Sequence, residues 1–213
     1  MKSRTLAVTA IALFFTINAH AQDVPKLELF LEYSYLRFNP TLPAINNRSF
    51  NGGGGGLDFN LTKHLAIRAE FMGYGSTTFT TTFVAPVVTS AGTIPAGTFS
   101  SSGNMFTYLF GPVIKYPTSK ATFFGEVLFG GSNTNAYAGL SRRIIASGGT
   151  IALQDTQHPF TMAVGGGFDI NLSEHFAIRP ADVSYLLTRY TNPLTSTNNQ
   201  NNFRYAGGLV FKF

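Results

Sequence analysis

Residues Gly55–Arg68 read GGLDFNLTKHLAIR, and residues Gly166–Arg179, 111 positions later, read GGFDINLSEHFAIR. In both copies apolar and polar residues alternate up to a short polar break and then alternate again. Alternation of period two on both sides of a short break predicts a β-hairpin with a tight turn. One arm of each hairpin carries an aspartate among its polar positions, and the other arm carries an arginine.

The rest of the chain alternates in the same way. Long connecting segments alternate with very short ones along the chain. The four long segments are rich in Asn, Thr, Ser, Gly and Pro and lie at 39–49, 77–102, 133–158 and 191–202; the short ones number three. The segments between them predict strands at 26–38, 50–62, 64–76, 103–116, 120–132, 159–172, 175–190 and 203–213. Long loops on one side and tight turns on the other are typical of outer-membrane barrels. The expected fold is therefore an all-β, eight-stranded antiparallel up-and-down transmembrane β-barrel with four long extracellular loops and three short periplasmic turns.

The two faces of the predicted strands differ in chemistry. One face is apolar and rich in Phe, whereas the other carries charges, glycines and small residues. A soluble barrel would turn the charges outward, but only 12% of the residues are charged, too few to cover such a surface. We therefore expect apolar side chains toward lipid and polar side chains inside. In segment 175–190 the alternation puts Asp182 on the outer face, unless a bulge near Pro180 returns it to the lumen.

Eleven charged residues are predicted to point into the lumen. They are Glu28, Glu32, Asp58, Arg68, Glu70, Lys115, Glu126, Asp169, Arg179, Arg204 and Lys212. Buried charges persist when they are paired and hydrogen-bonded, so we expect a salt-bridged plug that ties the strands together. Arg68 should face Asp58, and Arg179 should face Asp169 or a neighbouring glutamate. The alternative is a narrow, charge-lined path for ions or small solutes.

The first residues have the pattern of a secretory signal peptide. Lys2 and Arg4 precede an apolar run, and Ala19-His20-Ala21 is a small-x-small site for cleavage. The expected domains are a signal peptide at 1–21 and an outer-membrane barrel at 22–213, with a retained N-terminal anchor as the alternative. Without residues 1–21 the net charge is +3, and the basic residues are scattered, which argues against a nucleic-acid partner.

Taken together, the chain resembles the eight-stranded outer-membrane barrels related to the transmembrane domain of outer membrane protein A. The resemblance is carried by both copies of Gly-Gly-x-Asp-x-x-Leu followed by His-x-Ala-x-Arg, by the loop rhythm, and by the alternating end of the chain. It implies a location in the bacterial outer membrane, in contact with its lipid. It also implies that the barrel-insertion machinery reads a terminal signal, formed here by Tyr205, Leu209, Phe211 and Phe213.

The sequence offers little for catalysis or cofactor binding. The glycine runs lack the residues of a phosphate-binding loop, and the histidines do not form a metal-binding set. His158, Asp155 and one of Ser141 or Ser147 could meet at the rim as a lipid hydrolase, but no Gly-x-Ser-x-Gly motif is present. We expect no catalytic residue, cofactor or metal, and a monomer with a role in envelope integrity or surface contact through its loops, the surface ligand being unknown. A small pore and the rim hydrolase are the alternatives.

Overall fold

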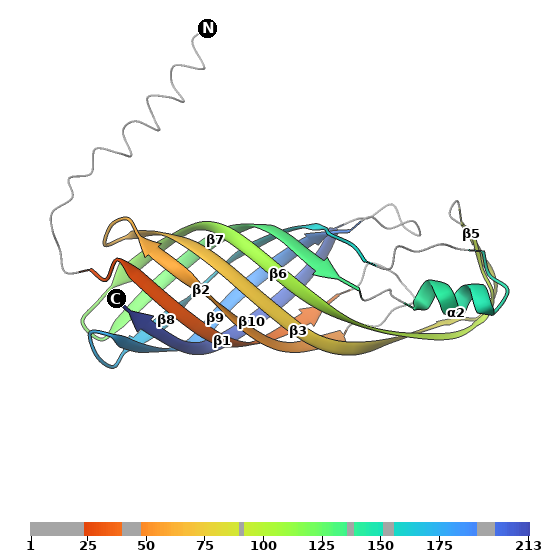
Figure 1. The fold of residues 1–213 in the computed structure, drawn as a ribbon, viewed down its shortest axis with the longest axis horizontal. Helices are drawn as coiled ribbons and strands as arrows, with labels where there is room; N and C mark the ends of the chain where they lie inside the picture. The colour runs from red at the N-terminus through yellow and green to blue at the C-terminus, as the bar shows by residue number, and fades with distance from the viewer. Residues whose placement is uncertain (1–23, 40–47, 90–91, 136–138, 151–155, 191–198) are drawn as a thin grey trace, which may run out of the picture.

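The alternating segments form a closed antiparallel barrel of eight strands in the computed structural model (Figure 1). The structure describes residues 24–39, 48–89, 92–135, 139–150, 156–190 and 199–213, so the predicted signal peptide lies outside the described residues. Around the barrel the strands follow the order β1, β2, β3, β6, β7, β8, β9 and β10. Their bounds are Leu27–Phe38 (β1), Arg48–Asn60 (β2), Leu65–Phe83 (β3), Gly97–Pro117 (β6), Ala121–Thr134 (β7), Phe160–Asn171 (β8), Phe176–Arg189 (β9) and Asn199–Lys212 (β10). The predicted fold class is confirmed.

The first and last strands close the barrel. The Phe213 amide donates to the Leu27 carbonyl oxygen at 2.8 Å, and the Leu27 amide donates back to Phe213 at 3.3 Å. The pairing continues along β1 and β10 as far as Arg37 and Phe203. Closure removes the two sheet edges, whose unpaired backbone groups would otherwise be costly in a membrane. The C-terminus and the start of β1 lie at the short-turn end of the barrel (Figure 1).

The repeated hairpins turn in the same way. The amides of Leu61 and Thr62 donate to the Leu65 carbonyl oxygen, and those of Leu172 and Ser173 donate to that of Phe176. The polar break of each repeat therefore closes one turn between β2 and β3 and another between β8 and β9. Both short joins lie where the repeated sequence predicted them.

The expectation that the strands on either side of the loop at 77–102 end at 76 and resume at 103 is wrong. β3 and β6 continue past the barrel and remain paired out to Phe83 and Gly97. Beyond them β4 (Val87–Thr89) pairs with β5 (Gly92–Ile94). The polar composition of this segment predicts a loop, but many of its polar residues are threonines, which favour strands.

Part of the predicted loop 133–158 is also ordered, as helix α2 (Leu140–Ala146). Leu140 and Ile144 of α2 pack with Ile94 and Phe99 of the extended hairpin, and Phe83 packs against this cluster. The helix and the hairpin together form an extension at the loop end of the barrel, opposite the chain end (Figure 1). We refer to residues 77–89, 92–102 and 139–150 as the extension.

A bulge in β9 brings Asp182 inside. Arg179 pairs with Gly208 but Asp182 pairs with Ala206, so β9 uses one residue more than β10 between these pairs. The Pro180 carbonyl oxygen at this irregularity accepts a hydrogen bond from the Tyr205 hydroxyl at 2.7 Å. Because the extra residue shifts the alternation by one, Asp182 is fully buried. The bulge lies near Pro180, as the alternation had required.

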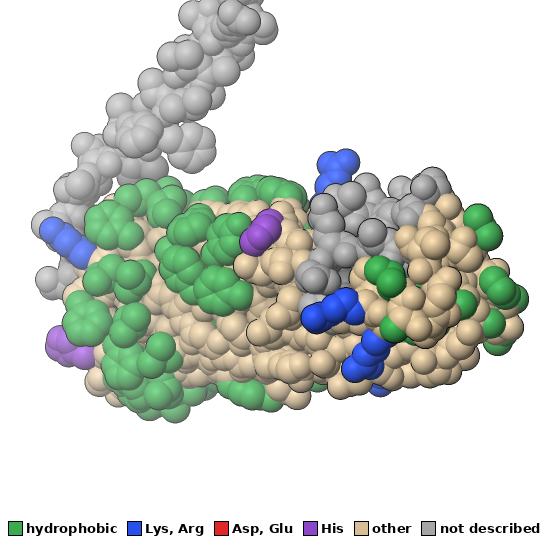
Figure 2. All heavy atoms as spheres, turned by 45° about the vertical axis from the view of Figure 1, so that its right-hand side comes forward, with side chains coloured by type: hydrophobic (Ala, Val, Ile, Leu, Met, Phe, Trp, Pro, Cys, Tyr) green, Lys and Arg blue, Asp and Glu red, His purple; other side chains and the backbone are tan. Residues whose placement is uncertain are grey.

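The outer surface of the barrel is apolar. Large exposed side chains such as Leu31, Phe59, Phe110, Phe129 and Phe203 come from many strands. Figure 2 shows hydrophobic side chains over the barrel body, and no described acidic side chain on this face. Along the described chain, no helix has the length and the apolar composition needed to cross a membrane.

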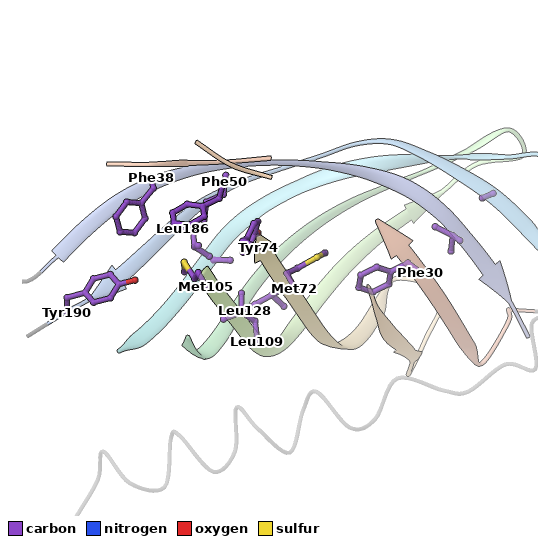
Figure 3. Packing of buried hydrophobic residues seen from close by; sticks show 14 residues of the cluster. Phe30, Phe38, Phe50, Met72, Tyr74, Met105, Leu109, Leu128, Leu186 and Tyr190 are labelled. Atoms are coloured by element: carbon purple, nitrogen blue, oxygen red, sulfur yellow. The ribbon is translucent and has the colours of Figure 1, made fainter. Parts of the chain in front are cut away.

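The interior is not polar throughout, which corrects the expectation of polar side chains inside. Toward the loop end the lumen is filled by an apolar cluster (Figure 3) that includes Phe38, Phe50, Met105, Leu186 and Tyr190. The Phe38 ring packs edge-on against Phe50 at a centroid distance of 5.5 Å and against Tyr190 at 6.2 Å. We call the part of the cluster near the loops, formed by these residues, the apolar layer; Phe30, a further member of the cluster, lies among the charges. The predicted charges occupy the half of the lumen nearer the short turns.

Candidate functional site: a charged layer in the lumen

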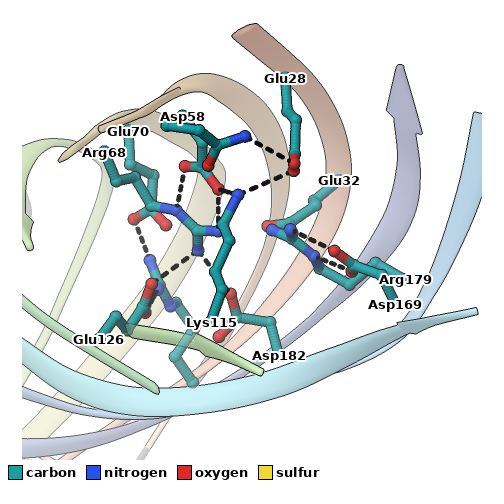
Figure 4. Close-up of polar contacts among 12 residues, drawn as sticks. Glu28, Glu32, Asp58, Arg68, Glu70, Lys115, Glu126, Asp169, Arg179 and Asp182 are labelled. Carbon is teal, nitrogen blue, oxygen red and sulfur yellow. Dashed lines mark hydrogen bonds and ion pairs between the residues drawn. The ribbon is translucent and has the colours of Figure 1, made fainter. Parts of the chain in front are cut away.

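Two arginines at matching positions of the sequence repeat organise the charged layer (Figure 4). Arg68 of β3 holds Asp58 of the same hairpin with two bonds, Nε to Oδ1 at 2.7 Å and Nη2 to Oδ2 at 2.9 Å. Its Nη1 also reaches across the lumen to Glu126 Oε2 of β7 at 2.6 Å. Arg68 therefore ties its own hairpin to β7, past the intervening strand β6.

Arg179 repeats this arrangement from the other side. It holds Asp169 through Nε at 2.6 Å and Nη2 at 3.1 Å, and its Nη1 lies 2.9 Å from Glu32 Oε1 of β1. The pairs Arg68–Asp58 and Arg179–Asp169 are the two that the repeat predicted. Paired bonds between guanidinium and carboxylate fix the orientation of both groups as well as their distance.

Two phenylalanines pack against both guanidinium groups. The Phe30 ring centroid lies 4.6 Å from Arg68 Cζ and 4.9 Å from Arg179 Cζ. The Phe124 centroid lies 4.8 Å and 4.4 Å from the same two atoms. A cation within about 6 Å of an aromatic ring is attracted to its face, so the rings stabilise the arginines where water is scarce.

The charged layer has an approximate twofold repetition that extends beyond the repeated stretch. Phe30 and Glu32 on β1 match Phe124 and Glu126 on β7, because both pairs lie opposite the glycine-rich strand of a repeat. Phe30 pairs with Gly56, and Phe124 pairs with Gly167, at equivalent positions of the two copies. A Cβ atom on Gly56 would lie 2.5 Å from Phe30 Cζ, and one on Gly167 would lie 2.9 Å from Phe124 Cζ. These glycines leave the space that the two rings occupy.

Arg204 of β10 departs from the repetition. Its Nε donates to Ser184 at 2.7 Å, its Nη2 lies 3.2 Å from Glu126 Oε1, and its Nη1 forms an ion pair with Glu70. Glu126 therefore receives one arginine on each carboxylate oxygen.

Toward the short turns the layer ends in two lysines. Lys115 Nζ lies 2.8 Å from Glu28 and 2.9 Å from Asp58, whereas Lys212 Nζ donates to Asn171 at 2.7 Å. Lys212 is thus in the lumen as expected, but no ion pair joins it to a carboxylate among the described residues. A cavity of about 300 Å³ lies at this mouth of the barrel, lined by residues that include Glu28, Asn60 and both lysines.

All eleven predicted lumen charges are buried, and Asp182 joins them. Asp182 Oδ2 lies 3.4 Å from Arg68 Nη1. The sequence pointed to Asp182 only through the condition that a bulge forms near Pro180. Phe30 and Phe124 were missed as partners of the arginines, although their places in the alternation put both on the inner face.

The residues considered for a rim hydrolase do not form such a site in the described chain. The Ser147 hydroxyl donates to the Arg143 carbonyl oxygen at 3.0 Å, within its own helical turn. His158 is exposed and Ser141 is buried, and no described hydrogen bond joins His158 to either serine. Asp155 lies outside the described residues.

The residues expected to form the terminal insertion signal share the outer face of β10. Tyr205, Leu209 and Phe213 are exposed, and the half-buried Phe211 ring packs against Phe176 of β9 at 5.4 Å. Their recognition by the insertion machinery remains a prediction.

Comparisons with known proteins find the fold rather than a close relative. No family model matches the chain, and no curated protein matches its sequence. The structure is similar to that of Neisserial surface protein A, with a TM-score of 0.57 and 9% identity over 90% of this chain and 100% of that one. It is also similar to the outer membrane protein OprG from Pseudomonas aeruginosa, with a TM-score of 0.53 and 11% identity over 89% of this chain and 97% of that one. The chain therefore has the fold of the eight-stranded bacterial outer-membrane barrels, and its apolar outer face and closed backbone suit that membrane.

Proposed function

We propose that this protein is a non-enzymatic outer-membrane barrel with a sealed lumen, which holds the extension at the cell surface for contact with other molecules. The observation that carries the proposal is that two successive layers of side chains fill the lumen. The charged layer lies nearer the short turns, and the apolar layer lies nearer the loops (Figures 3 and 4). Eight strands leave an interior just wide enough for side chains to fill.

The two layers oppose solute passage in different ways. Ions that enter from the short-turn mouth meet Arg68 and Arg179, which are each paired with carboxylates and packed against two phenylalanine rings. Beyond them an ion meets mostly large apolar side chains, with the buried Thr188, Gln200 and Asn202 among them, and the loss of its hydration shell there is costly. A barrel built in this way serves as a rigid support rather than as a conduit.

The extension is the part suited to contact. Its own apolar cluster holds α2 on the hairpin, and Arg143 Nη1 donates to the Ser100 carbonyl oxygen. Exposed on it are Val84, Val88 and Ile145, together with the positive charges of Arg142 and Arg143. A surface that combines exposed apolar and basic groups favours a partner with apolar and anionic groups.

Two measurements test the proposal. Refolded protein in planar bilayers should show no steady single-channel current. Cells that display a variant in which Thr80–Ser100 is replaced by a short turn should keep the barrel in the outer membrane but lose adherence to host cells or matrix. Adherence equal to that of the unaltered protein would remove the surface role, provided that both barrels are present in equal amounts.

A narrow pore is the second candidate, and the cavity at the short-turn mouth favours it. This cavity reaches Glu28 and Lys115, so the charged layer is approached by solvent from one side. Passage would still require both layers to open. Steady current from the unaltered protein would decide for the pore and against the sealed support.

A further inference from the structure

The charged layer contains more negative than positive charges; Arg48, whose Nε is also buried, lies opposite Phe38 at the loop end, outside this layer. Its buried acids are Glu28, Glu32, Asp58, Glu70, Glu126, Asp169 and Asp182, and its buried bases are Arg68, Lys115, Arg179, Arg204 and Lys212. Seven carboxylates against five cations leave an excess of two negative charges. Uncompensated charge inside a protein is strongly destabilising, so this excess is neutralised by bound cations or by protons.

The excess is concentrated at one place. Glu32 of β1, Glu70 of β3 and Asp182 of β9 each offer a carboxylate oxygen, and these three oxygens lie within 4.8 Å of one another. The three side chains are 5%, 0% and 0% exposed, respectively. We call them the carboxylate cluster.

Each carboxylate of the cluster has one oxygen that the arginines do not use. Arg179 contacts Oε1 of Glu32, Arg204 contacts Oε1 of Glu70, and Arg68 contacts Oδ2 of Asp182. The other oxygens are Glu32 Oε2, Glu70 Oε2 and Asp182 Oδ1. All three are buried and have no hydrogen-bond partner among the residues that the structure describes. A buried carboxylate oxygen without a donor calls for a cation or a proton.

The same position in the other half of the barrel lacks this feature. Glu126 matches Glu32 in the approximate twofold repetition, but its Oε2 is held by Arg68 and its Oε1 by Arg204. The unpartnered oxygens therefore mark the carboxylate cluster, rather than the charged layer as a whole.

We propose that the carboxylate cluster binds one hard divalent cation, of which Ca²⁺ is the best fit. Ca²⁺ takes carboxylate oxygens at about 2.3–2.6 Å, so ligands on opposite sides of the ion can lie up to about twice that distance apart. The spacing in the cluster falls within this limit. One divalent ion supplies the two positive charges that the charged layer lacks, and water can complete its coordination. The ion would link β1, β3 and β9, and so would lock the charged layer as a structural element.

The test loads the metal during refolding, so that access to a finished lumen is not needed. Full-length mature protein is refolded from urea into detergent with CaCl₂ or with EDTA, and is then freed of unbound metal by gel filtration. Bound metal is counted by mass spectrometry of the elements, and the urea midpoint of unfolding is measured for both samples. The variant is Asp182→Asn, and its matched control is Glu126→Gln, which removes the same charge at the same depth outside the cluster.

We expect one Ca²⁺ per barrel in the unaltered protein, and a urea midpoint that is higher after refolding with CaCl₂ than with EDTA. Asp182→Asn should lose both the bound metal and the response to CaCl₂, whereas Glu126→Gln should keep them even if its midpoint falls. Metal bound equally by Asp182→Asn would place the ion elsewhere and overturn the proposal. Unaltered protein with no bound Ca²⁺ and equal midpoints would overturn it as well, and would mean that protons neutralise the excess. If Asp182→Asn does not refold, Glu70→Gln, which removes another carboxylate of the cluster, takes its place with the same expected and contrary results.

Discussion

Arg179 occupies both carboxylate oxygens of Asp169, at 2.6 and 3.1 Å, and uses its remaining nitrogen to hold Glu32 on the far side of β10. One side chain thus joins the second hairpin repeat to the first strand of the barrel. Both partners of this contact are buried. The loss of either partner leaves a buried charge without its counter-ion.

Arg179→Ala should therefore destabilise the barrel by roughly 3–5 kcal/mol, or by less if water enters the gap, because it leaves the buried charge of Asp169 without its counter-ion. Asp169→Ala should recover part of this loss in the double variant, since the unpaired carboxylate is then removed as well. Urea unfolding of the four proteins in detergent or lipid vesicles gives the coupling free energy. Additive effects of the two changes would mean that the pair does not act as a unit.

The glycines opposite the lumen phenylalanines provide a second prediction. A Cβ atom on Gly56 would lie 2.1 Å from the Ala69 carbonyl oxygen and 2.5 Å from the Phe30 ring. Gly56→Ala should therefore cost about 1–3 kcal/mol, the usual range for overpacking. Gly73→Ala on the neighbouring strand is the matched control, because its Cβ would meet nothing closer than 3.8 Å. We expect Gly73→Ala to leave the urea midpoint unchanged or to raise it, and equal losses for both variants would contradict the packing argument.

The sequence predicts contacts within a hairpin far better than contacts across the lumen. Alternation and a short turn are enough to place Asp58 beside Arg68. The contact between Arg68 and Glu126 depends on the stagger of all eight strands, which no local pattern contains. Asp182 shows the same limit, because a single extra residue in β9 decides which face it occupies.

Composition explains the two places where the sequence misled. The threonine-rich segment 77–102 reads as a loop, yet pairing between β3 and β6 continues through much of it because its residues suit strands. In the lumen, alternation did place Met72, Tyr74 and Phe30 on the inner face. The expectation that the inner face is polar left no place for the apolar layer. This layer forms because inward residues near the loops, such as Phe38 and Phe50, are large and apolar.

The last residue should matter for assembly. Phe213 pairs with Leu27 through two backbone hydrogen bonds, and its side chain continues the exposed row of β10. Deleting Phe213 should lower the fraction of folded, protease-resistant barrel in outer-membrane extracts, because both closure and the terminal signal are weakened. Heat-modifiable migration on gels measures this fraction. Levels equal to those of the full chain would count against the prediction.

Packing of α2 on the hairpin can be tested with two neighbouring isoleucines. Ile144 is 1% exposed and belongs to the cluster with Ile94 and Phe99, whereas Ile145 is 52% exposed. Ile144→Ala should loosen the helix and speed trypsin cleavage after Arg142 or Arg143, while Ile145→Ala should not. The barrel should stay folded in both variants, since the cluster lies outside it. Equal cleavage rates would show that the helix is not held by this cluster.

The sealed lumen leads to a prediction about combined variants. Phe38→Ala with Tyr190→Ala opens space in the apolar layer but leaves Arg68, Arg179 and Arg204 paired below it. Arg179→Ala alone loosens the charged layer but leaves the Phe38, Phe50 and Tyr190 rings above it. Because the layers lie in series, each of these proteins should stay closed in planar bilayers, and only the triple variant should carry steady current. Current from Arg179→Ala alone would mean that the apolar layer does not seal the barrel, and current from the unaltered protein would show that neither layer does.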